Sequence, residues 1–296
     1  MNSPLYKKKT PLLLFLIPAF AFLAVFLFYP FVQNIINSFL NISGLGTAAT
    51  GVNEPWYSDF TKMFQDKNML TAIKNSLILT GCTIVFQVGI ALVLALLVDR
   101  IKAGAKLFRT VYFFPIVISA TALGLMFNLI FLFKGGMLNQ MLQNWFGATG
   151  NIDWKDGQHF LGTMLTPVMW QYVGFYFVII VTGLNNISTE VYEAAELDGA
   201  KGFRRTWYIT LPLLRNVLFT CLVLGITGAL KVFDLPWVMM GQGIPMDQSW
   251  LLGTYMYNQA FIRGDVDYAS AIAVLIVVMG VIFALVANKV FKQKDY

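Results

Sequence analysis

Long apolar runs separated by short polar segments dominate the pattern along the chain. Six runs are long enough to cross a bilayer, because the hydrocarbon layer is roughly 30 Å thick and takes about 20 helical residues to span. They lie at about 11–31, 71–98, 110–133, 160–184, 213–235 and 268–289. Each must be a helix, since backbone amides have no water partner in lipid and the runs lack the two-residue alternation of a barrel strand. The pattern predicts an all-α membrane protein with six transmembrane helices.

Composition agrees with the hydrophobic pattern. The chain is 57% hydrophobic and 12% charged, whereas soluble domains are about 45–50% apolar and about 25% charged. The first run follows Lys7-Lys8-Lys9, which would also suit a signal peptide. However, its apolar stretch is longer than a signal-peptide core and no small-residue cleavage site follows it. We therefore expect a retained first span.

The basic residues of the short loops predict the orientation, because they collect on the cytoplasmic side of a membrane. With the N-terminus inside, 14 of the 21 basic residues fall in inner loops and tails, six fall outside, and Lys231 lies within a span. The opposite topology would invert this bias. Both termini are therefore predicted to be cytoplasmic. The formal charge of +6 then reflects topology and contact with anionic lipid, and no basic tract points to nucleic acid.

Several kinds of chemistry are missing from the sequence. Cys82 and Cys221 both fall inside spans, so they are expected to be small packing residues. One histidine, His159, and two separated cysteines cannot supply the usual ligands of a zinc site. The chain also lacks a GxxxxGK[ST] phosphate loop. We expect no metal and no cofactor bound by this chain. We divide it into 1–70, which holds a tail, the first span and an outer loop, a five-helix core at 71–289, and a tail at 290–296.

One loop between the fourth and fifth spans is unusually polar. The 23 residues from Glu190 to Pro212 carry seven charged side chains. Ser188 or Thr189 can cap a helix here, with Glu190 in its first turn, where the helix dipole favours negative charge. Gly199 suits the end of that helix, where a left-handed residue is often needed. A second helical piece at about 203–210 would complete a helix-turn-helix on the cytoplasmic face.

The first of these helices has a shallow apolar face. Val191, Ala194 and Ala195 lie at i, i+3 and i+4, flanked by acidic residues that include Glu193 and Asp198. A partner could approach such a face closely. On these observations alone, the segment could equally be a solvated loop whose charges keep it out of the bilayer.

The residues of this loop resemble a known motif. Glu193-Ala194-Ala195, Asp198-Gly199-Ala200 and Ile209-x-Leu211-Pro212 are similar to the EAA loop of binding-protein-dependent ABC importer permeases, most closely the maltose-type sugar permease subunits. The likeness extends to other segments, namely Leu16-Ile17-Pro18-Ala19, Phe28-Tyr29-Pro30, Phe114-Pro115, Gly136-x-x-Asn139, Trp170, Phe261 and Tyr268-Ala269-Ser270-Ala271. Mild departures are Trp207 where the family usually has Phe, Ser188 where it has Pro, and Gly241-Gln242-Gly243-Ile244-Pro245 at an outer turn. The last of these puts only the shape of the outer loop in doubt.

The resemblance implies a type I ABC importer transmembrane domain in a bacterial or archaeal cytoplasmic (inner) membrane. Its implied partners are a second permease subunit, two ATP-binding subunits that use ATP and Mg²⁺, and an extracytoplasmic sugar-binding protein. The chain itself would be non-catalytic. The EAA loop would be the coupling helix seated in a cleft of the ATPase. The residues implied for coupling are Glu190, Glu193, Ala194, Ala195, Asp198 and Gly199.

Polar and aromatic residues within the spans are candidates for the substrate pathway. Sugars are recognised by hydroxyl hydrogen bonds and aromatic stacking, and polar groups within spans are costly enough to mark pathways. The candidates are Asn128, Trp170, Gln171, Tyr172, Tyr176, Lys231, Phe233 and Asp234. Each aromatic residue could instead pack or anchor at an interface. Lys231 and Asp234, at i and i+3 of one expected helix, could pair with one another.

Alternative functions stay open at this point. The permease could carry a peptide, an amino acid or glycerol phosphate. A secondary transporter could use Asp234 in an ion relay, but this would leave the EAA loop unexplained. A membrane enzyme is disfavoured, because no intramembrane HExxH and no nucleophile–base arrangement is present. Copurification of an ATPase and a second permease would separate the importer from the other classes.

Overall fold

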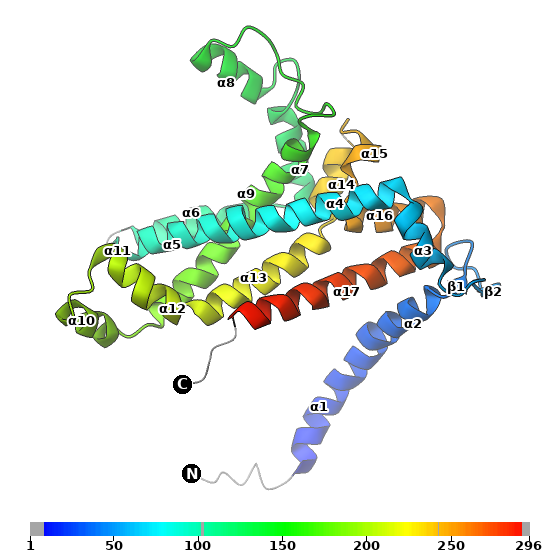
Figure 1. Cartoon of the computed structure of the whole chain (residues 1–296), viewed down its shortest axis with the longest axis horizontal. Helices are drawn as coiled ribbons and strands as arrows, with labels where there is room; N and C mark the ends of the chain where they lie inside the picture. The colour runs from blue at the N-terminus through cyan, green and yellow to red at the C-terminus, as the bar shows by residue number, and fades with distance from the viewer. Residues whose placement is uncertain (1–8, 102–103, 242, 292–296) are drawn as a thin grey trace. The chain divides into compact units, whose positions relative to one another are not determined.

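Helices make up almost all of the described chain in the computed structural model (Figure 1). The structure describes residues 9–101, 104–241 and 243–291. The chain divides into two compact units, one of Met1–Gln65 with Met256–Leu275 and one of Asp66–Tyr255 with Ile276–Tyr296. The boundary drawn from the sequence at residue 70 lies near the end of the first segment, but Met256–Leu275 groups with the N-terminal part. Lys7, Lys8, Lys102, Gln242 and most of the predicted tail at 290–296 lie outside the described residues.

Five helical segments are long and apolar enough to cross a membrane. They are Leu13–Asn37, Lys67–Asp99, Phe160–Asn185, Arg215–Met240 and Val266–Phe291. A sixth span is present if α6 (Ala105–Val117) and α7 (Ala120–Ile130) count as one, although this pair bends by 96°. The third predicted span is therefore a broken helix, and the other five predicted runs each coincide with one helical segment.

The first unit consists of a long apolar helix and a small polar cap. Its elements are α1 (Lys9–Leu23), the π-helical stretch η2 (Ala24–Phe28), α2 (Tyr29–Asn37), β1 (Leu40–Asn41), β2 (Gly51–Val52), α3 (Ser58–Gln65), η5 (Asn258–Arg263) and the start of α17 (Val266–Phe291). β1 and β2 pair antiparallel, with Leu40 opposite Val52. None of the apolar window of the Leu13–Asn37 helix is buried, so its side chains are available to lipid or to another subunit.

Polar contacts fasten the loop after α2 to the start of α17. The backbone N–H of Ile42 donates to Asp267 Oδ2 at 3.2 Å, and Asn53 Nδ2 donates to Asp59 Oδ2 at 2.8 Å. The Lys62 ammonium lies 4.2 Å from the centroid of the Tyr268 ring. Burial raises the pKa of the Asp59 carboxyl, and the nearby charge of Asp267 raises it further.

The second unit contains most of the spans. Its elements are α4 (Lys67–Cys82), the π-helical stretch η3 (Thr83–Val88), α5 (Gly89–Asp99), α6, α7, α8 (Met137–Phe146), α9 (Phe160–Asn185), α10 (Thr189–Leu197), α11 (Gly202–Arg205), η4 (Thr206–Thr210), α12 (Leu211–Leu213), α13 (Arg215–Leu230), α14 (Asp234–Met240), α15 (Met246–Ser249), most of α16 (Leu252–Tyr257) and the end of α17. The helix α9 is central, because α5, α6, α13, α14 and η3 all contact it.

Small residues let the neighbours of α9 approach closely. Ala91 and Ala95 of α5 are fully buried in one cluster with Phe177 and Ile180 of α9 and Cys221 of α13. Such small residues are typical of helix contacts in membranes, where packing and not hydrophobicity holds helices together. Burial of Cys221 agrees with its interpretation as a packing residue, whereas Cys82 is only partly buried.

Gly174 marks the closest approach between α6 and α9. A Cβ atom added there would overlap the backbone carbonyl of Tyr112. We predict that Gly174→Ala separates these helices and lowers stability by about 1–3 kcal/mol, the usual cost of overpacking. Thermal unfolding of the purified protein, followed by size-exclusion chromatography, measures this. Gly162→Ala on the same helix is the control, because nothing lies within 4 Å of its added Cβ. Equal melting temperatures for the two variants would contradict the prediction.

Candidate functional site

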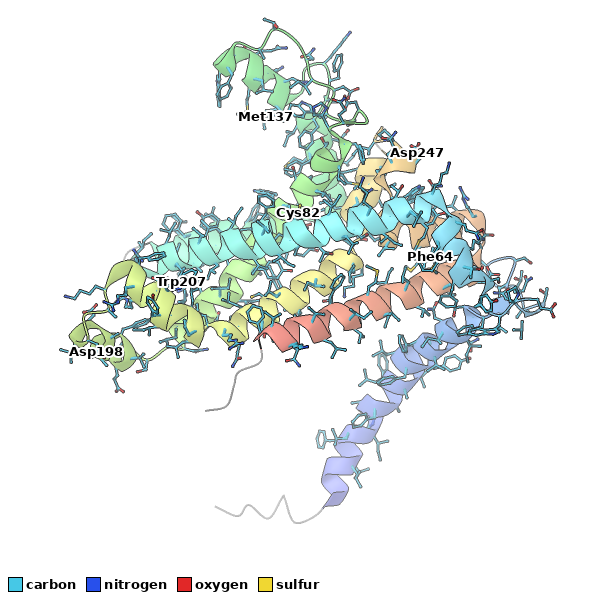
Figure 2. The ribbon with its side chains drawn as sticks, in the orientation of Figure 1. Phe64, Cys82, Met137, Asp198, Trp207 and Asp247 are labelled. Atoms are coloured by element: carbon cyan, nitrogen blue, oxygen red, sulfur yellow. The ribbon has the colours of Figure 1, made fainter. Side chains whose placement is uncertain are left out.

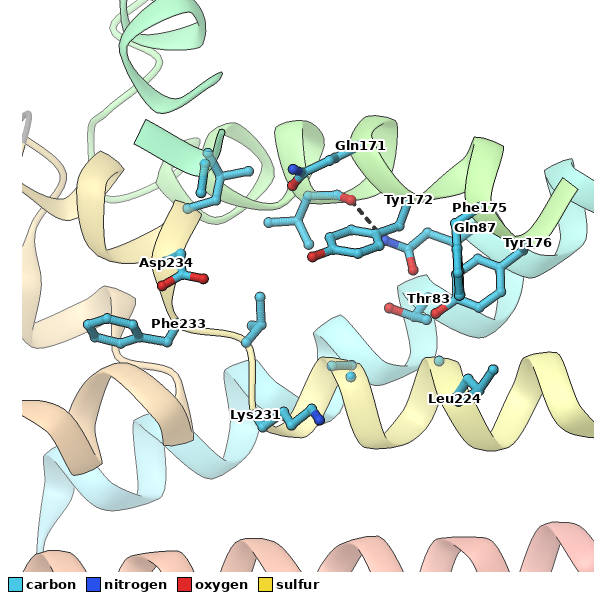
Figure 3. A pocket seen from close by; sticks show the side chains of 17 residues that line it. Thr83, Gln87, Gln171, Tyr172, Phe175, Tyr176, Leu224, Lys231, Phe233 and Asp234 are labelled. Carbon is cyan, nitrogen blue, oxygen red and sulfur yellow. Dashed lines mark hydrogen bonds between the residues drawn. The ribbon is translucent and has the colours of Figure 1, made fainter. Parts of the chain in front are cut away.

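A cavity of about 470 Å³ lies between η3, α9, α13 and α14 (Figure 3). Six of the eight predicted pathway residues line it, namely Gln171, Tyr172, Tyr176, Lys231, Phe233 and Asp234. They come from two separate spans, and Figure 3 shows the ring of Tyr172 extending from α9 into the space between α9 and α13. The structure thus brings together hydroxyl, amide, aromatic and charged groups around one space.

Two interruptions of helical structure border this cavity. α6 ends at Ile118, whose carbonyl accepts a hydrogen bond from Gln171 Nε2 at 3.3 Å, and Ser119 Oγ caps α7 by accepting from the Ala122 N–H at 3.2 Å. α13 ends at Leu230 with Lys231 as its C-cap residue, and α14 begins at Asp234 after the irregular residues Val232 and Phe233. Helix breaks at membrane depth are tolerated where protein groups or a water-filled cavity satisfy the freed backbone.

The second interruption corrects the expected pairing of Lys231 with Asp234. The two residues do not share one helix, because the chain is irregular at Val232 and Phe233. No ion pair within 4.0 Å joins these two described residues. Backbone packing holds the break, since a Cβ added at Gly253 of α16 would meet the carbonyl oxygens of Lys231 and Val232. The cavity therefore presents one cation and one anion as separate groups.

Asn128 and Trp170 do not line the cavity. Asn128 Oδ1 accepts a hydrogen bond from Lys155 Nζ, and burial lowers the pKa of this lysine. The Trp170 ring packs edge-on against Phe127 with centroids 5.7 Å apart, and 43% of the residue is exposed. Both side chains therefore pack against neighbouring residues at the outer surface of the α7–α9 region.

Sequence reasoning missed several lining residues. Thr83 and Gln87 of η3 line the cavity and are almost fully buried, and Gln87 Nε2 donates to the carbonyl of Val168 at 2.9 Å (Figure 3). Phe175 of α9 and Gly225 of α13 also line it. The sequence did contain a signal for Thr83 and Gln87, because these two polar residues interrupt the apolar run at 71–98.

The polar loop forms the predicted helix-turn-helix. Ser188 is the N-cap residue of α10, although its side chain makes no capping hydrogen bond. Gly199 has φ of +77°, which confirms its predicted left-handed conformation. The N–H groups of Ala200 and Gly199 donate to the carbonyls of Ala195 and Glu196 at 2.8 and 3.2 Å, the pattern of a Schellman C-cap. Arg205 then fixes the return segment to α10, with Nη1 3.1 Å from Glu196 Oε1 and its guanidinium 5.0 Å from the Tyr192 ring centroid.

The exposed face of this segment differs from the predicted one. Ala195 is only 5% exposed, so it packs within the chain and cannot lie on a surface offered to a partner. Glu190, Glu193, Ala194 and Asp198 are exposed. Large apolar side chains are exposed beside them, most of all Leu197 at 91% and Phe203 at 77%. Figure 2 shows Asp198 at the turn after α10 and Trp207, half-exposed, on the return segment.

Comparisons with known proteins agree with this arrangement. Residues 87–294 match the family described as binding-protein-dependent transport system inner membrane component. The probable ABC transporter permease protein YurN of Bacillus subtilis (strain 168) is 31% identical over 94% of this chain and 95% of its own length. The sn-glycerol-3-phosphate transport system permease protein UgpA of Brucella abortus biovar 1 (strain 9-941) is 29% identical over 92% and 90%.

A solved structure matches the whole fold. The crystal structure of a bacterial ABC transporter involved in the import of the acidic polysaccharide alginate contains a chain that superposes with a TM-score of 0.82, at 22% identity and over 98% of both chains.

The chain belongs to the family of binding-protein-dependent transport system inner membrane components. It is a multi-pass inner membrane protein and the non-catalytic permease subunit of a binding-protein-dependent ABC importer, as the sequence resemblance implied.

The cavity geometry predicts which positions meet water. In a variant with Cys82 and Cys221 replaced by alanine, Tyr172→Cys is expected to react with a small charged thiol reagent, because it lines the cavity. Trp170→Cys is expected to react much more slowly, since it lies outside the cavity on an apolar surface where thiolate formation is unfavourable. Labelling rates in membrane vesicles, followed by mass spectrometry, test this. Faster labelling at position 170 would refute the placement.

Proposed function

We propose that the chain forms half of the translocation pathway of an ATP-driven sugar importer, with the cavity as part of the sugar path. The supporting observation is the lining of the cavity. Gln87, Gln171, Tyr172 and Thr83 offer amide and hydroxyl groups, and Phe233 offers an aromatic ring. Hydroxyl-rich solutes are recognised by this combination of hydrogen-bonding side chains and aromatic surface. The cavity is large enough for one sugar unit of an oligosaccharide to pass.

The charges of the cavity favour a neutral sugar over a phosphate ester. Lys231 and Asp234 contribute one positive and one negative group, whereas phosphate is usually held by several donors of positive charge, most often arginine. Glycerol phosphate, the solute named for one relative, is the second candidate.

The discriminating experiment reconstitutes the transporter with its binding protein and measures ATPase stimulation by neutral oligosaccharides and by glycerol phosphate. Stimulation by glycerol phosphate alone would overturn the sugar assignment.

Coupling to ATP hydrolysis would occur at α10 and its turn. The partners in this proposal are a second permease subunit, two ATP-binding subunits that use ATP and Mg²⁺, and an extracytoplasmic sugar-binding protein. α10 would lie on the cytoplasmic side with both termini. The capped turn at Gly199 and the Arg205–Glu196 contact support this role, because a rigid helix transmits motion of the ATPase to the spans better than a mobile loop. The exposed Leu197 and Phe203 offer apolar contacts to the ATPase.

Removal of the cavity cation tests the sugar path. Lys231→Met keeps the length of the side chain but loses its charge, and a hydrogen bond to a charged group contributes about 1.5–3 kcal/mol. We expect uptake to fall roughly tenfold or more, with normal copurification of the ATPase. Trp170→Phe, outside the cavity, is the control and is expected to retain uptake. Unchanged uptake in Lys231→Met would remove this lysine from the proposed path.

Charge placed on the exposed face of α10 tests coupling. Ala194→Asp and Leu197→Asp are expected to abolish association with the ATPase and sugar-stimulated ATP hydrolysis, because an unpaired charge buried at the contact costs several kcal/mol. Leu197→Met is the matched control. Membrane levels should stay normal in all three variants. Ala195→Asp should differ by lowering the amount of folded protein, since Ala195 is already buried within the chain. Normal stimulated hydrolysis in both exposed variants would exclude α10 as the contact.

A further inference from the structure

The helix α8 has an apolar face that is exposed at Met137, Trp145 and Phe146 and partly buried between them. Two rows of residues spaced four apart form this face, Met137, Met141 and Trp145 in one row and Leu138, Leu142 and Phe146 in the other. Met137 is 52% exposed, Trp145 is 70% exposed and Phe146 is 77% exposed. Figure 2 shows Met137 at the start of this helix. The helix has no charged side chain, and Asn139, Gln140, Gln143 and Asn144 form its polar side.

One residue of the polar side fastens α8 to the neighbouring chain, while Gln140, Gln143 and Asn144 are exposed. Asn139 is 1% exposed, and its Nδ2 group donates to the carbonyls of Leu132, Phe133 and Ile152 at 3.3, 3.1 and 3.0 Å. Its Oδ1 atom accepts from the Ile152 N–H and from Trp154 Nε1, both at 3.1 Å.

A second contact orients the helix further along. Gln143 Nε2 donates to Asn151 Oδ1 at 2.8 Å. These hydrogen bonds fix the rotation of α8 about its axis. The apolar face is therefore held outward by a built network, and the exposure of Trp145 is not the result of a loosely attached loop.

The surroundings of α8 identify what covers this face. Only six residues separate the end of α7 at Ile130 from the start of α8, so α8 lies beside the end of the candidate span formed by α6 and α7. Leu129 and Phe133, at the end of that membrane helix pair, are 63% and 46% exposed, and the apolar face of α8 continues this surface along the chain. The exposed Lys134 lies in the chain between Phe133 and the start of α8, where a cation can contact lipid phosphate.

We infer that α8 lies in the headgroup region of the bilayer, with Trp145 and Phe146 inserted among the lipids. Tryptophan is enriched at this depth, because its ring is apolar and its N–H needs a polar partner. An amphipathic helix with an aromatic apolar face lies in the plane of the membrane in this way. The anchored helix would steady α7, which packs against α14 and contributes Ala120 to the cavity wall.

Accessibility of spin labels tests the location. The complete transporter is reconstituted in nanodiscs, with Cys82 and Cys221 replaced by alanine and one nitroxide attached at Trp145→Cys or, as the control, at Gln140→Cys. We expect the label at 145 to be relaxed several-fold more by oxygen, which concentrates in lipid, than by a water-soluble nickel chelate. The label at 140, on the polar side of the same helix, should show the reverse preference.

Two outcomes would overturn the inference. Preference for the nickel chelate at both positions would place α8 in water, and protection of position 145 from both reagents would mean that another protein covers it.

A measurement without labelling guards against loss of folding in the cysteine variants. Lipids brominated near the headgroup should quench less tryptophan fluorescence in Trp145→Phe than in the unmodified transporter. Equal quenching would also contradict the inference.

Discussion

The structure depends on one constraint, which is that every backbone polar group at membrane depth must find a partner inside the protein. Continuous helices meet this requirement by themselves, so each place where a helix stops needs a specific substitute. Gln171 supplies one by donating to the Ile118 carbonyl between α6 and α7, and Ser119 caps the helix that follows. Close packing against Gly253 surrounds the carbonyls between α13 and α14. The cavity lies beside these two interruptions, and the second of them places Lys231, Phe233 and Asp234 in its lining.

Close helix packing connects this cavity to the coupling segment. α9 ends at Asn185, just before α10, and α13 starts at Arg215, just after α12. Two of the elements that line the cavity, α9 and α13, are therefore the spans that flank the helix-turn-helix. Gly174 lets α9 pack directly against the backbone of α6 at Tyr112, and Gly225 leaves room on α13 for the side chains of Thr83 and Tyr176. In the proposed function, a displacement of α10 by the ATPase would thus be carried directly to Tyr172, Tyr176 and Lys231.

The exposed surfaces indicate that the chain functions as one part of an assembly. The described chain has three separate apolar surfaces, namely the Leu13–Asn37 helix, the side chains around the turn after α10, and the aromatic face of α8. Each differs in its surroundings. The first has the length of a membrane span, the second is flanked by acidic side chains, and the third continues from the end of a span. In the proposed function, lipid, an ATPase and a bilayer boundary would each meet one of these surfaces, and the composition of each surface suits that neighbour.

The sequence by itself determined the class of protein, the places of the long apolar helices and the left-handed turn at Gly199. These features depend on local properties, namely the length of apolar runs, the φ angle that only glycine adopts easily at position 199, and the spacing of the EAA residues. It also identified six of the residues that line the cavity, because polar side chains in an apolar run are conspicuous. Only the tertiary structure decided which polar residues face the same space. It separated Lys231 from Asp234 by a helix break, buried Ala195, turned Asn128 and Trp170 away from the cavity, and added Thr83 and Gln87. The physical reason is that the direction of a side chain and the end of a helix depend on what packs against them, and in this protein those partners lie on other helices far along the chain.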